Sequence, residues 1–267
     1  SYKLKVQKTE IETPEIEGLL DNLPKDMFSP ILLGVDSYSL PIYCDMSKMP
    51  NMLIGGTTGS GKSVLLHNII LSLLKNGSQV YLIDPKMVEF SAYKDVDGVE
   101  GIFNDYDECE FVLEVIKSEM NDRFKLLSEK QCRSAEEYNK KYPGDKMKPM
   151  SLVVDEWADI VLQDKKILKP LCAIAQKCRA AGISIILATQ RPSSKVIPGI
   201  LKANFPARIA LRVSSSVDSR IILDKSGAEN INAIGEGIYS SPMERDDVIF
   251  RTTYIEDIRD FLRINNV

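Results

Sequence analysis

Gly56-Thr57-Thr58-Gly59-Ser60-Gly61-Lys62-Ser63 is the stretch that decides the fold. It fits G-x-x-x-x-G-K-[ST], in which backbone N–H groups of a glycine-rich turn point at the phosphates of a nucleotide. Lys62 can then reach the β and γ oxygens, and the Ser63 hydroxyl can ligate Mg²⁺. The pattern predicts a site for ATP with Mg²⁺. The residues expected to bind the nucleotide are Thr57, Thr58, Gly59, Ser60, Gly61, Lys62, Ser63 and Val64.

The sequence on either side of this loop supports the same interpretation. Residues 52–54 are apolar, which predicts a short buried strand, and residues 63–75 carry leucine and isoleucine at helical spacing. Strand, loop and helix in this order form the context that distinguishes a phosphate-binding loop from a chance glycine-rich turn.

Further apolar segments alternate with helical patterns along the chain. Strands are expected at 80–83, 151–154, 183–188 and 207–213, helices at about 107–128 and 165–181, and a hairpin at 31–35 and 41–44. Such alternation predicts an α/β fold whose central, mostly parallel sheet has helices on both faces. Binding sites of these sheets lie at the carboxyl ends of the strands, where the polar motifs of this chain also fall.

The domain organisation follows from where the regular pattern begins. Residues 1–30 are acidic and interrupted by proline, which suggests a linker or the remnant of an upstream domain. Residues 31–267 then form one ATPase domain, and the polar segment 129–149 is expected to be a surface excursion. Ser1 in place of methionine suggests an excised piece, so a membrane anchor outside it stays open.

Composition limits the classes of function. The 267 residues are 44% hydrophobic, enough for a sizeable core, and the net charge of −4 argues against coating nucleic acid with a basic surface. The net charge is compatible with basic residues that line a local channel. There is neither an apolar run long enough to span a bilayer nor an opening signal peptide, so we expect a cytoplasmic chain, with any membrane association through other segments.

The five cysteines are odd in number and show no C-x-x-C spacing, and His67 is the only histidine. Reduced thiols are therefore expected rather than a metal site. His67 follows the loop by about one helical turn, where a packed or surface role is favoured over a catalytic one.

Leu152-Val153-Val154-Asp155-Glu156 has the form of a Walker B motif. The apolar strand would place Asp155 beside the Mg²⁺ on Ser63, and Glu156 where it can polarise an attacking water. A kinase needs no such water, so the acidic pair favours hydrolysis. The alternative is a strand-end pair that only caps a helix.

Two further polar residues are candidates for the same site. Gln190 follows the strand after Walker B, where its amide can sense the γ-phosphate, or be an ordinary strand-end residue. Arg179 and Lys177 lie near the end of the expected helix 165–181, where they would complement the helix dipole. Alternatively, Arg179 enters the nucleotide site of a neighbouring subunit.

Several sequence blocks together resemble the motor domain of the FtsK/SpoIIIE DNA translocases, within the wider FtsK–HerA group, over residues 32–241. The blocks are Lys48-Met49-Pro50, Gly55 to Ser63, Ile83-Asp84-Pro85-Lys86-Met87, Val153-Val154-Asp155-Glu156, Gln176-Lys177-Cys178-Arg179-Ala180-Ala181-Gly182-Ile183, Leu187-Ala188-Thr189-Gln190-Arg191-Pro192-Ser193, Lys202-Ala203-Asn204-Phe205-Pro206 and Val217 to Asp224. Several blocks in the right order are far more specific than any one of them.

The resemblance implies a RecA-like P-loop ATPase that assembles as a homo-hexameric ring and moves double-stranded DNA through its centre, with a monomer left open for a truncated chain. It implies that Lys62, Asp155, Glu156 and Gln190 are catalytic, that Ser63 and Asp155 hold the metal, and that Arg179 acts in trans. Arg191, Lys202 and Arg220 match regions that face the pore, so they are expected to contact DNA phosphates, with intersubunit salt bridges as the alternative.

The chain also departs from the family pattern. Ser216 stands where relatives often carry lysine, and segment 129–149 is shorter than in many relatives. The residues up to Val267 include no winged-helix module, so we do not expect this sequence by itself to direct orientation on DNA. The shortened form fits chromosome segregation, phage DNA handling, or conjugation with a relaxase partner. Two other functions stay open: a ring ATPase for protein secretion, like EssC, and a nonmotor module that merely binds nucleotide.

Overall fold

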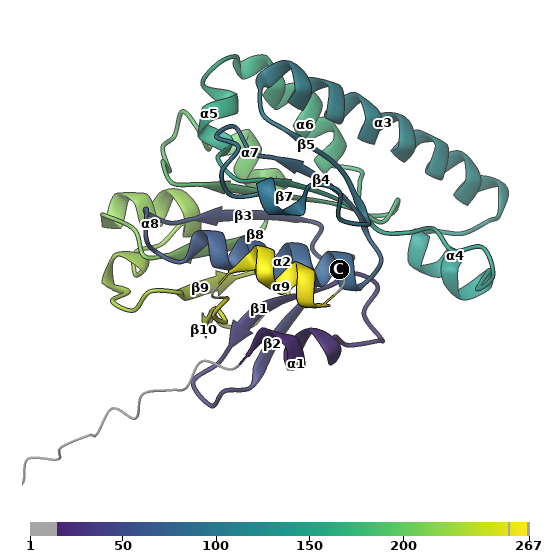
Figure 1. The fold of residues 1–267 in the computed structure, drawn as a ribbon. Coiled ribbons are helices and arrows are strands. Elements are labelled where there is room, and N and C mark those ends of the chain that lie inside the picture. Colours follow the sequence, from purple (N-terminus) through teal and green to yellow (C-terminus); the bar gives the residue numbers. More distant parts are fainter. Residues whose placement is uncertain (1–14, 256, 266–267) are drawn as a thin grey trace, which may run out of the picture.

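The computed structural model describes residues 15–255 and 257–265, and its strands form one sheet (Figure 1). The order across the sheet is β2-β1-β10-β9-β8-β3-β7-β6-β4-β5. The strands are β1 (Pro30–Val35), β2 (Pro41–Asp45), β3 (Asn51–Gly55), β4 (Gln79–Ile83), β5 (Val99–Phe103), β6 (Met150–Val154), β7 (Ile183–Thr189), β8 (Ala207–Leu211), β9 (Glu236–Ser240) and β10 (Val248–Arg251).

One half of the sheet is parallel and the other is antiparallel. Strands β8, β3, β7, β6, β4 and β5 run parallel, while β9, β10, β1 and β2 are joined by antiparallel pairing. Strands β3, β6 and β7 are buried along their whole length, which explains their near-continuous apolar sequence. The mostly parallel α/β sheet is therefore confirmed.

Helices cover both faces of the sheet, as predicted (Figure 1). The longer helices are α1 (Ile16–Asp21), α2 (Lys62–Lys75), α3 (Tyr106–Glu129), α4 (Ala135–Lys141), α5 (Trp157–Val161), α6 (Leu168–Ala175), α7 (Gly199–Asn204), α8 (Ser216–Leu223) and α9 (Ile258–Asn265), with short 3₁₀ turns η1 (Ser91–Tyr93), η2 (Lys165–Ile167) and η3 (Ala228–Asn230). Helices α1, α2 and α9 pack into one apolar core, and α3, α5, α6 and α7 into another on the opposite face.

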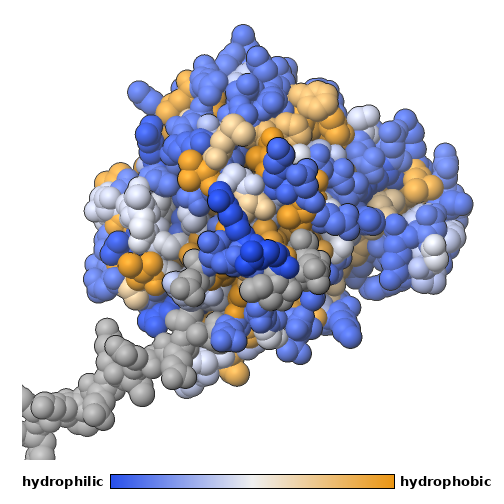
Figure 2. Space-filling view, viewed as in Figure 1, coloured by the Kyte–Doolittle hydropathy of each residue, from blue (hydrophilic) through white to orange (hydrophobic). Residues whose placement is uncertain are grey.

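Helix α3 shows how local sequence and packing agree. Its N-cap Asp105 accepts a hydrogen bond from the Glu108 amide at 2.8 Å, and the Glu108 carboxylate accepts one from the Asn104 amide at 2.7 Å. Apolar residues at helical spacing, from Cys109 to Leu127, are buried. Hydrophilic residues predominate over α3 and α4 on the face shown in Figure 2, so α3 is a half-buried helix at the molecular surface.

Two expected segments differ from the structure. The helix expected at 165–181 is only η2 and α6, because the chain leaves the helix after Ala175, whose carbonyl accepts a hydrogen bond from the Asn51 side chain at 2.8 Å. The segment 129–149 is more than an excursion: it contains α4, which packs Tyr138 and neighbouring residues into a small core of its own.

The structure of the N-terminal and C-terminal parts of the chain was the hardest to predict from the sequence. Residues 1–14 of the expected linker lie outside the described residues, but α1 buries Ile16 and Leu20 in the main core, so residues from α1 onward pack on the ATPase domain. The boundary at residue 30 stays a prediction.

Strands β9 and β10 were not predicted, and β10 lies between β9 and β1 in the sheet. Among the helices that the structure describes, none has the length and apolar character to cross a bilayer.

Candidate nucleotide-binding site

The loop of residues 56–61 joins the buried strand β3 to α2 at the carboxyl edge of the parallel strands. Its last residue, Gly61, has φ +99°, a left-handed conformation that other residues rarely adopt. A Cβ atom on Gly56 would lie 2.6 Å from the Ser60 hydroxyl. The glycines thus allow a tight turn that ends directly in the first turn of a helix, the geometry that binds phosphate.

Three neighbouring segments hold this loop in place. The Gly56 amide donates to the Thr189 carbonyl at 3.3 Å, and the Thr57 amide donates to the Arg212 carbonyl at 2.9 Å. The Gly235 amide donates to the Ser60 carbonyl at 2.9 Å. The loop is therefore fixed by the ends of β7 and β8 and by the turn before β9.

Lys62 and Asp155 meet in a buried ion pair beneath the loop. The two side chains are 3% and 2% exposed, and the Lys62 ammonium also donates to the Asp155 carbonyl at 3.2 Å. Asp155 follows β6, two strands away from β3 across the sheet. The structure thus brings together the two charged groups that the sequence assigned to phosphate and metal.

Glu156 lies beside this pair and is 1% exposed. Its carboxylate accepts hydrogen bonds from the Thr189 hydroxyl at 2.6 Å and from the Gln190 amide at 2.9 Å. Although Glu156 immediately precedes α5, its side chain makes no capping hydrogen bond to that helix. This observation speaks against the alternative in which the acidic pair only caps a helix.

Gln190 connects Glu156 to the phosphate loop. Its side-chain carbonyl accepts a hydrogen bond from the Thr58 hydroxyl at 2.7 Å, while its backbone amide contacts Glu156. A change at the loop can therefore reach the acidic pair through a single residue.

The donor atoms around the loop fit a nucleotide with Mg²⁺. The buried Ser60 hydroxyl has no hydrogen-bond partner in residues 15–255 and 257–265. Mg²⁺ prefers hydroxyl and carboxylate oxygens, which Ser63 at the start of α2 and Asp155 would supply. Residues 57–61 lead directly into the first turn of α2, which holds Lys62, Ser63 and Val64, so that the loop ends at a helix N-terminus, as a phosphate-binding loop requires.

Arg179 lies far from this edge, in the turn between α6 and β7 at the amino ends of the parallel strands. Its guanidinium donates to the Ser47 carbonyl at 3.2 Å. Because Arg179 lies beyond the end of α6, it does not complement that helix's dipole. Within one chain, Arg179 and the phosphate loop occupy opposite edges of the sheet.

A cavity of about 530 Å³ next to Arg179 is mainly basic, with four cations and one carboxylate, that of Glu136, in its lining. It is also lined by Lys48, Arg133 and Lys177, and none of these four cations forms an ion pair within the part of the chain that the structure describes. Four unpaired cations in one cavity of an acidic chain indicate a site for an anionic partner.

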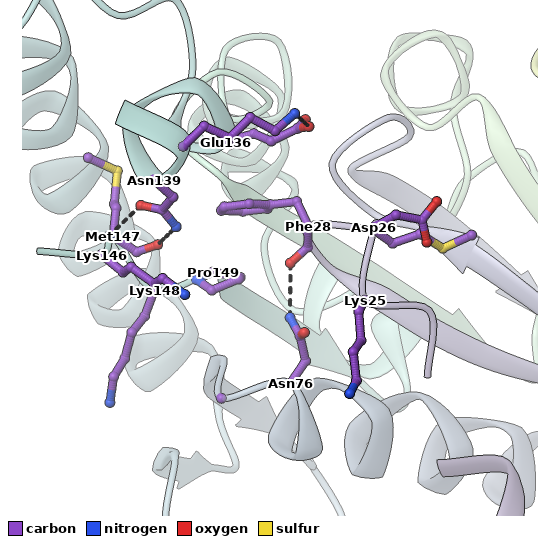
Figure 3. Close-up of a pocket in the computed structure, with 13 residues that line it drawn as sticks. Lys25, Asp26, Phe28, Asn76, Glu136, Asn139, Lys146, Met147, Lys148 and Pro149 are labelled. Carbon is purple, nitrogen blue, oxygen red and sulfur yellow. Dashed lines mark hydrogen bonds and ion pairs between the residues drawn. The ribbon is translucent and has the colours of Figure 1, made fainter. Parts of the chain in front are cut away.

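A second hollow adjoins this cavity, because Phe28 and Glu136 line both. Figure 3 shows that the Asn76 side chain donates to the Phe28 carbonyl, at 3.0 Å, and that the Asn139 side chain bonds both the amide and the carbonyl of Met147. These contacts tie α2 and α4 to the segments that enter β1 and β6.

The three residues expected to contact DNA have different surroundings. Lys202 pairs with Asp224, a carboxylate that it shares with Arg208, so its charge is partly compensated within the chain. Desolvation would raise the pKa of Asp224, but hydrogen bonds from Lys202 and Arg208 outweigh it and lower that pKa. Arg220 is exposed on α8 and lines one hollow with Lys202.

Arg191 is also exposed and follows Gln190 after β7. Its guanidinium lies 3.9 Å from the Asp159 carboxylate. Among the described residues, Arg220 forms no ion pair, and the ion pair of Arg191 is longer than that of Lys202.

Sequence reasoning missed two residues at the site. Thr189, whose hydroxyl contacts Glu156, is fully buried, and its only signal was its place directly before Gln190. Gly235, which contacts the loop, lies far along the chain in a turn that no pattern marked. Long-range contacts of this kind leave no periodic signal.

A phosphate loop on a central parallel strand, with its lysine paired to the aspartate of a neighbouring strand, occurs in P-loop ATPases, and the fold and site define this class. Within it, the FtsK/SpoIIIE family model matches residues 24–194, more than half of the chain, and the protein belongs to that family.

The sequence relatives are longer than this chain. It is 40% identical over 238 residues to "DNA translocase FtsK 2" of Ralstonia nicotianae, and the match covers 79% of this chain and 30% of that protein. It is 37% identical over 289 residues to "DNA translocase FtsK" of Haemophilus influenzae, and this match covers 92% of the chain and 55% of the relative. The chain thus spans about a third to about half of these relatives.

Solved structures agree on the fold. The pCW3 conjugation coupling protein TcpA, in a monomer form with ATPγS, superposes with a TM-score of 0.82 at 29% identity, covering 96% of this chain and 74% of TcpA. The cytoplasmic domain of the Thermomonospora curvata Type VII secretion ATPase EccC superposes with a TM-score of 0.76 at 23% identity, covering 91% of this chain and 30% of EccC. At that identity, the similarity to EccC concerns the fold alone.

Proposed function

We propose that this chain is the motor of an ATP-hydrolysing translocase that moves double-stranded DNA. The observation that carries the proposal is the contact of Glu156 with Gln190, which in turn contacts the phosphate loop. A buried glutamate beside the metal-binding aspartate serves hydrolysis, and its link to the loop suits a motor, which must sense whether phosphate is present. Sequence relatives named as DNA translocases support DNA as the substrate.

The chemistry follows from the placement of the side chains. Lys62 exchanges its contact with Asp155 for the β and γ oxygens of ATP. Ser63 and Asp155 would hold Mg²⁺, which neutralises charge on the phosphates. Glu156 orients the attacking water and accepts its proton. Gln190 then responds to the loss of the γ-phosphate through Thr58 and the loop.

A second copy of the chain completes the site. Arg179 and the basic cavity beside it lie at the edge of the sheet opposite the phosphate loop, so they can meet only the nucleotide of a neighbour. Repeating one head-to-tail contact closes a ring, and we propose a hexamer. Arg179 would then stabilise the charge that develops on the transferred phosphoryl group.

DNA would pass through the centre of the ring, past the pore-facing segments that carry Arg191 and Arg220. Few contacts per subunit suffice because six subunits share the duplex, which reconciles DNA binding with a net charge of −4. We further propose that the motor works in the cytoplasm, and that any membrane anchor or relaxase is joined through segments outside this chain.

The decisive experiment measures the ATPase rate with and without linear duplex DNA. We expect a several-fold higher rate with DNA, and no activity in Lys62→Ala. A rate that does not respond to DNA would defeat the proposal. Stimulation by a secretion-signal peptide instead of DNA would favour the protein-secretion alternative.

A further inference from the structure

Both carboxylate oxygens of Glu156 accept hydrogen bonds from the end of β7. One carboxylate oxygen accepts hydrogen bonds from the Thr189 hydroxyl at 2.6 Å and from the Gln190 amide at 3.2 Å. The other oxygen accepts from the same amide at 2.9 Å. Glu156 is 1% exposed and Thr189 is 0% exposed, so both groups are shielded from solvent.

A general base must have a carboxylate oxygen within hydrogen-bonding reach of the water that it activates. Here the donors around Glu156 are protein groups, and solvent does not reach it. The side chain is therefore held in a resting position. To act on water, it must leave the Thr189 hydroxyl.

The phosphate loop connects to this resting position. The Thr58 hydroxyl, in the loop, donates to the Gln190 side chain at 2.7 Å. Phosphate oxygens bound in the loop compete for the same hydroxyl, because they are strong acceptors. Loss of the Thr58 contact frees Gln190, whose backbone amide holds Glu156.

We infer that Thr189 is a positioning residue that restrains Glu156 until nucleotide in the loop, which draws Thr58 away from Gln190, and DNA at Arg191 together release it. The inference rests on the proposed function, since it concerns the same hydrolytic site. The Arg191 amide donates to the Thr189 hydroxyl at 3.1 Å, so DNA held by Arg191 acts on the same contact. Thr189 thus keeps the ATPase rate low in subunits that are not engaged with DNA.

The first test compares Thr189→Val, which removes the hydroxyl at nearly constant volume, with Thr189→Ser, which keeps it. Thr189→Val should raise the ATPase rate without DNA by about tenfold, the order expected for one hydrogen bond to a charged group. The ATPase rate with DNA should change little, so the ratio of the rate with DNA to the rate without DNA falls. Thr189→Ser should keep the wild-type ratio.

A fluorescence measurement gives a readout that does not depend on turnover. Trp157 is the only tryptophan and directly follows Glu156, with its indole nitrogen donating to the Val196 carbonyl at 3.1 Å. ATPγS together with duplex DNA should shift Trp157 emission in the wild type and in Thr189→Ser. Thr189→Val should show much of that shift before nucleotide is added.

Thr58→Val provides a second variant at an exposed position where folding is not at risk. At saturating ATP it should also raise the rate without DNA, although the KM for ATP rises. An unchanged rate without DNA and unchanged emission in Thr189→Val would overturn the inference, as would an equal fall of both rates. If DNA does not stimulate the ATPase of the wild type, the proposed function is wrong. If DNA stimulates the wild type and Thr189→Val has the same rates as the wild type, only this inference is wrong.

Discussion

At the scale of single residues, the buried charges of Lys62 and Asp155 compensate each other. Both are almost completely buried, and a charge buried without a partner costs several kcal/mol. The pair therefore stabilises the fold as well as preparing the site.

Lys62→Ala should abolish ATPase activity and also lower the free energy of unfolding by about 3–5 kcal/mol, because Asp155 is left unpaired. The double variant Lys62→Ala/Asp155→Asn should recover part of that stability without recovering activity. Urea denaturation measures the stability, and a phosphate-release assay measures the activity. Equal stability of the two variants would show that the buried charge is not the cause.

His67 makes stability depend on pH. Burial lowers its pKa from 6.5 to about 4, and its Nδ1 lies 2.9 Å from the Tyr93 hydroxyl. The unfolded chain binds the proton at a higher pH than the folded chain. The stabilisation is thus fully present above pH 6.5 and is lost as pH falls toward 4, by about 3 kcal/mol at most.

Urea titrations between pH 5 and 7 check this prediction, because His67 is the only histidine. The free energy of unfolding should fall with pH in the wild type, with a shallower slope in His67→Gln. Identical slopes in the two proteins would assign the pH dependence to carboxylates instead.

Arg220 and Lys202 form a matched pair for testing the DNA contacts. Arg220→Ala should weaken duplex binding and reduce the slope of log K against log salt by about 1 per lost phosphate contact. Lys202→Ala should change that slope less, since Lys202 is paired with Asp224. Fluorescence anisotropy at several salt concentrations measures both. A larger effect from Lys202 would reverse the assignment.

At the scale of elements, the turn before β9 supports the phosphate loop. Gly235 has φ +78°, and its Cα would lie 2.7 Å from a Cβ on Gly61. A Cβ on Gly235 itself would collide with the Thr252 hydroxyl. Two glycines therefore permit the close approach of two backbones that hydrogen-bond through Ser60.

Gly235→Ala should weaken ATP binding and lower the free energy of unfolding by more than about 1 kcal/mol, because alanine is strained at positive φ. Gly144→Ala is the control, since a Cβ there meets nothing within 4 Å. Calorimetric titration with ATPγS and thermal unfolding measure the two effects. Wild-type affinity in Gly235→Ala would show that the loop needs no such support.

Local signals account for what the sequence could predict. Helix α2 and the strand before it follow from apolar periodicity, and Lys62, Asp155 and Gln190 from motifs at strand ends. Strand β9 was missed because the residues that it buries, Gly237 and Tyr239, give no apolar alternation in the sequence, and β10 was missed because it is short and buries only Phe250. The length of helix α6 was overestimated, since the helix ends where the Ala175 carbonyl contacts the distant side chain of Asn51.

At the scale of the whole molecule, the proposed ring would join Arg179, at the amino ends of the parallel strands, to the phosphate loop of a neighbouring copy. Lys62→Ala loses the lysine of the phosphate loop but keeps Arg179. Arg179→Ala loses the arginine of the basic cavity but keeps Lys62. Each should be inactive alone, whereas an equimolar mixture should regain ATPase activity at mixed interfaces. A mixture no more active than the separate variants would place Arg179 outside the site.

The position of β10 has a consequence for how the chain is made. Residues 248–251 insert between β9 and β1, and Arg251 pairs with Val35, more than two hundred residues earlier. While the ribosome is still adding β3 to β9, one edge of the first hairpin has no partner strand. The sheet closes only when nearly the entire domain has emerged, so such non-local pairing makes the last folding step slow. Until then the exposed edge of β1 is a place where nascent chains can aggregate, and chaperones would shield it.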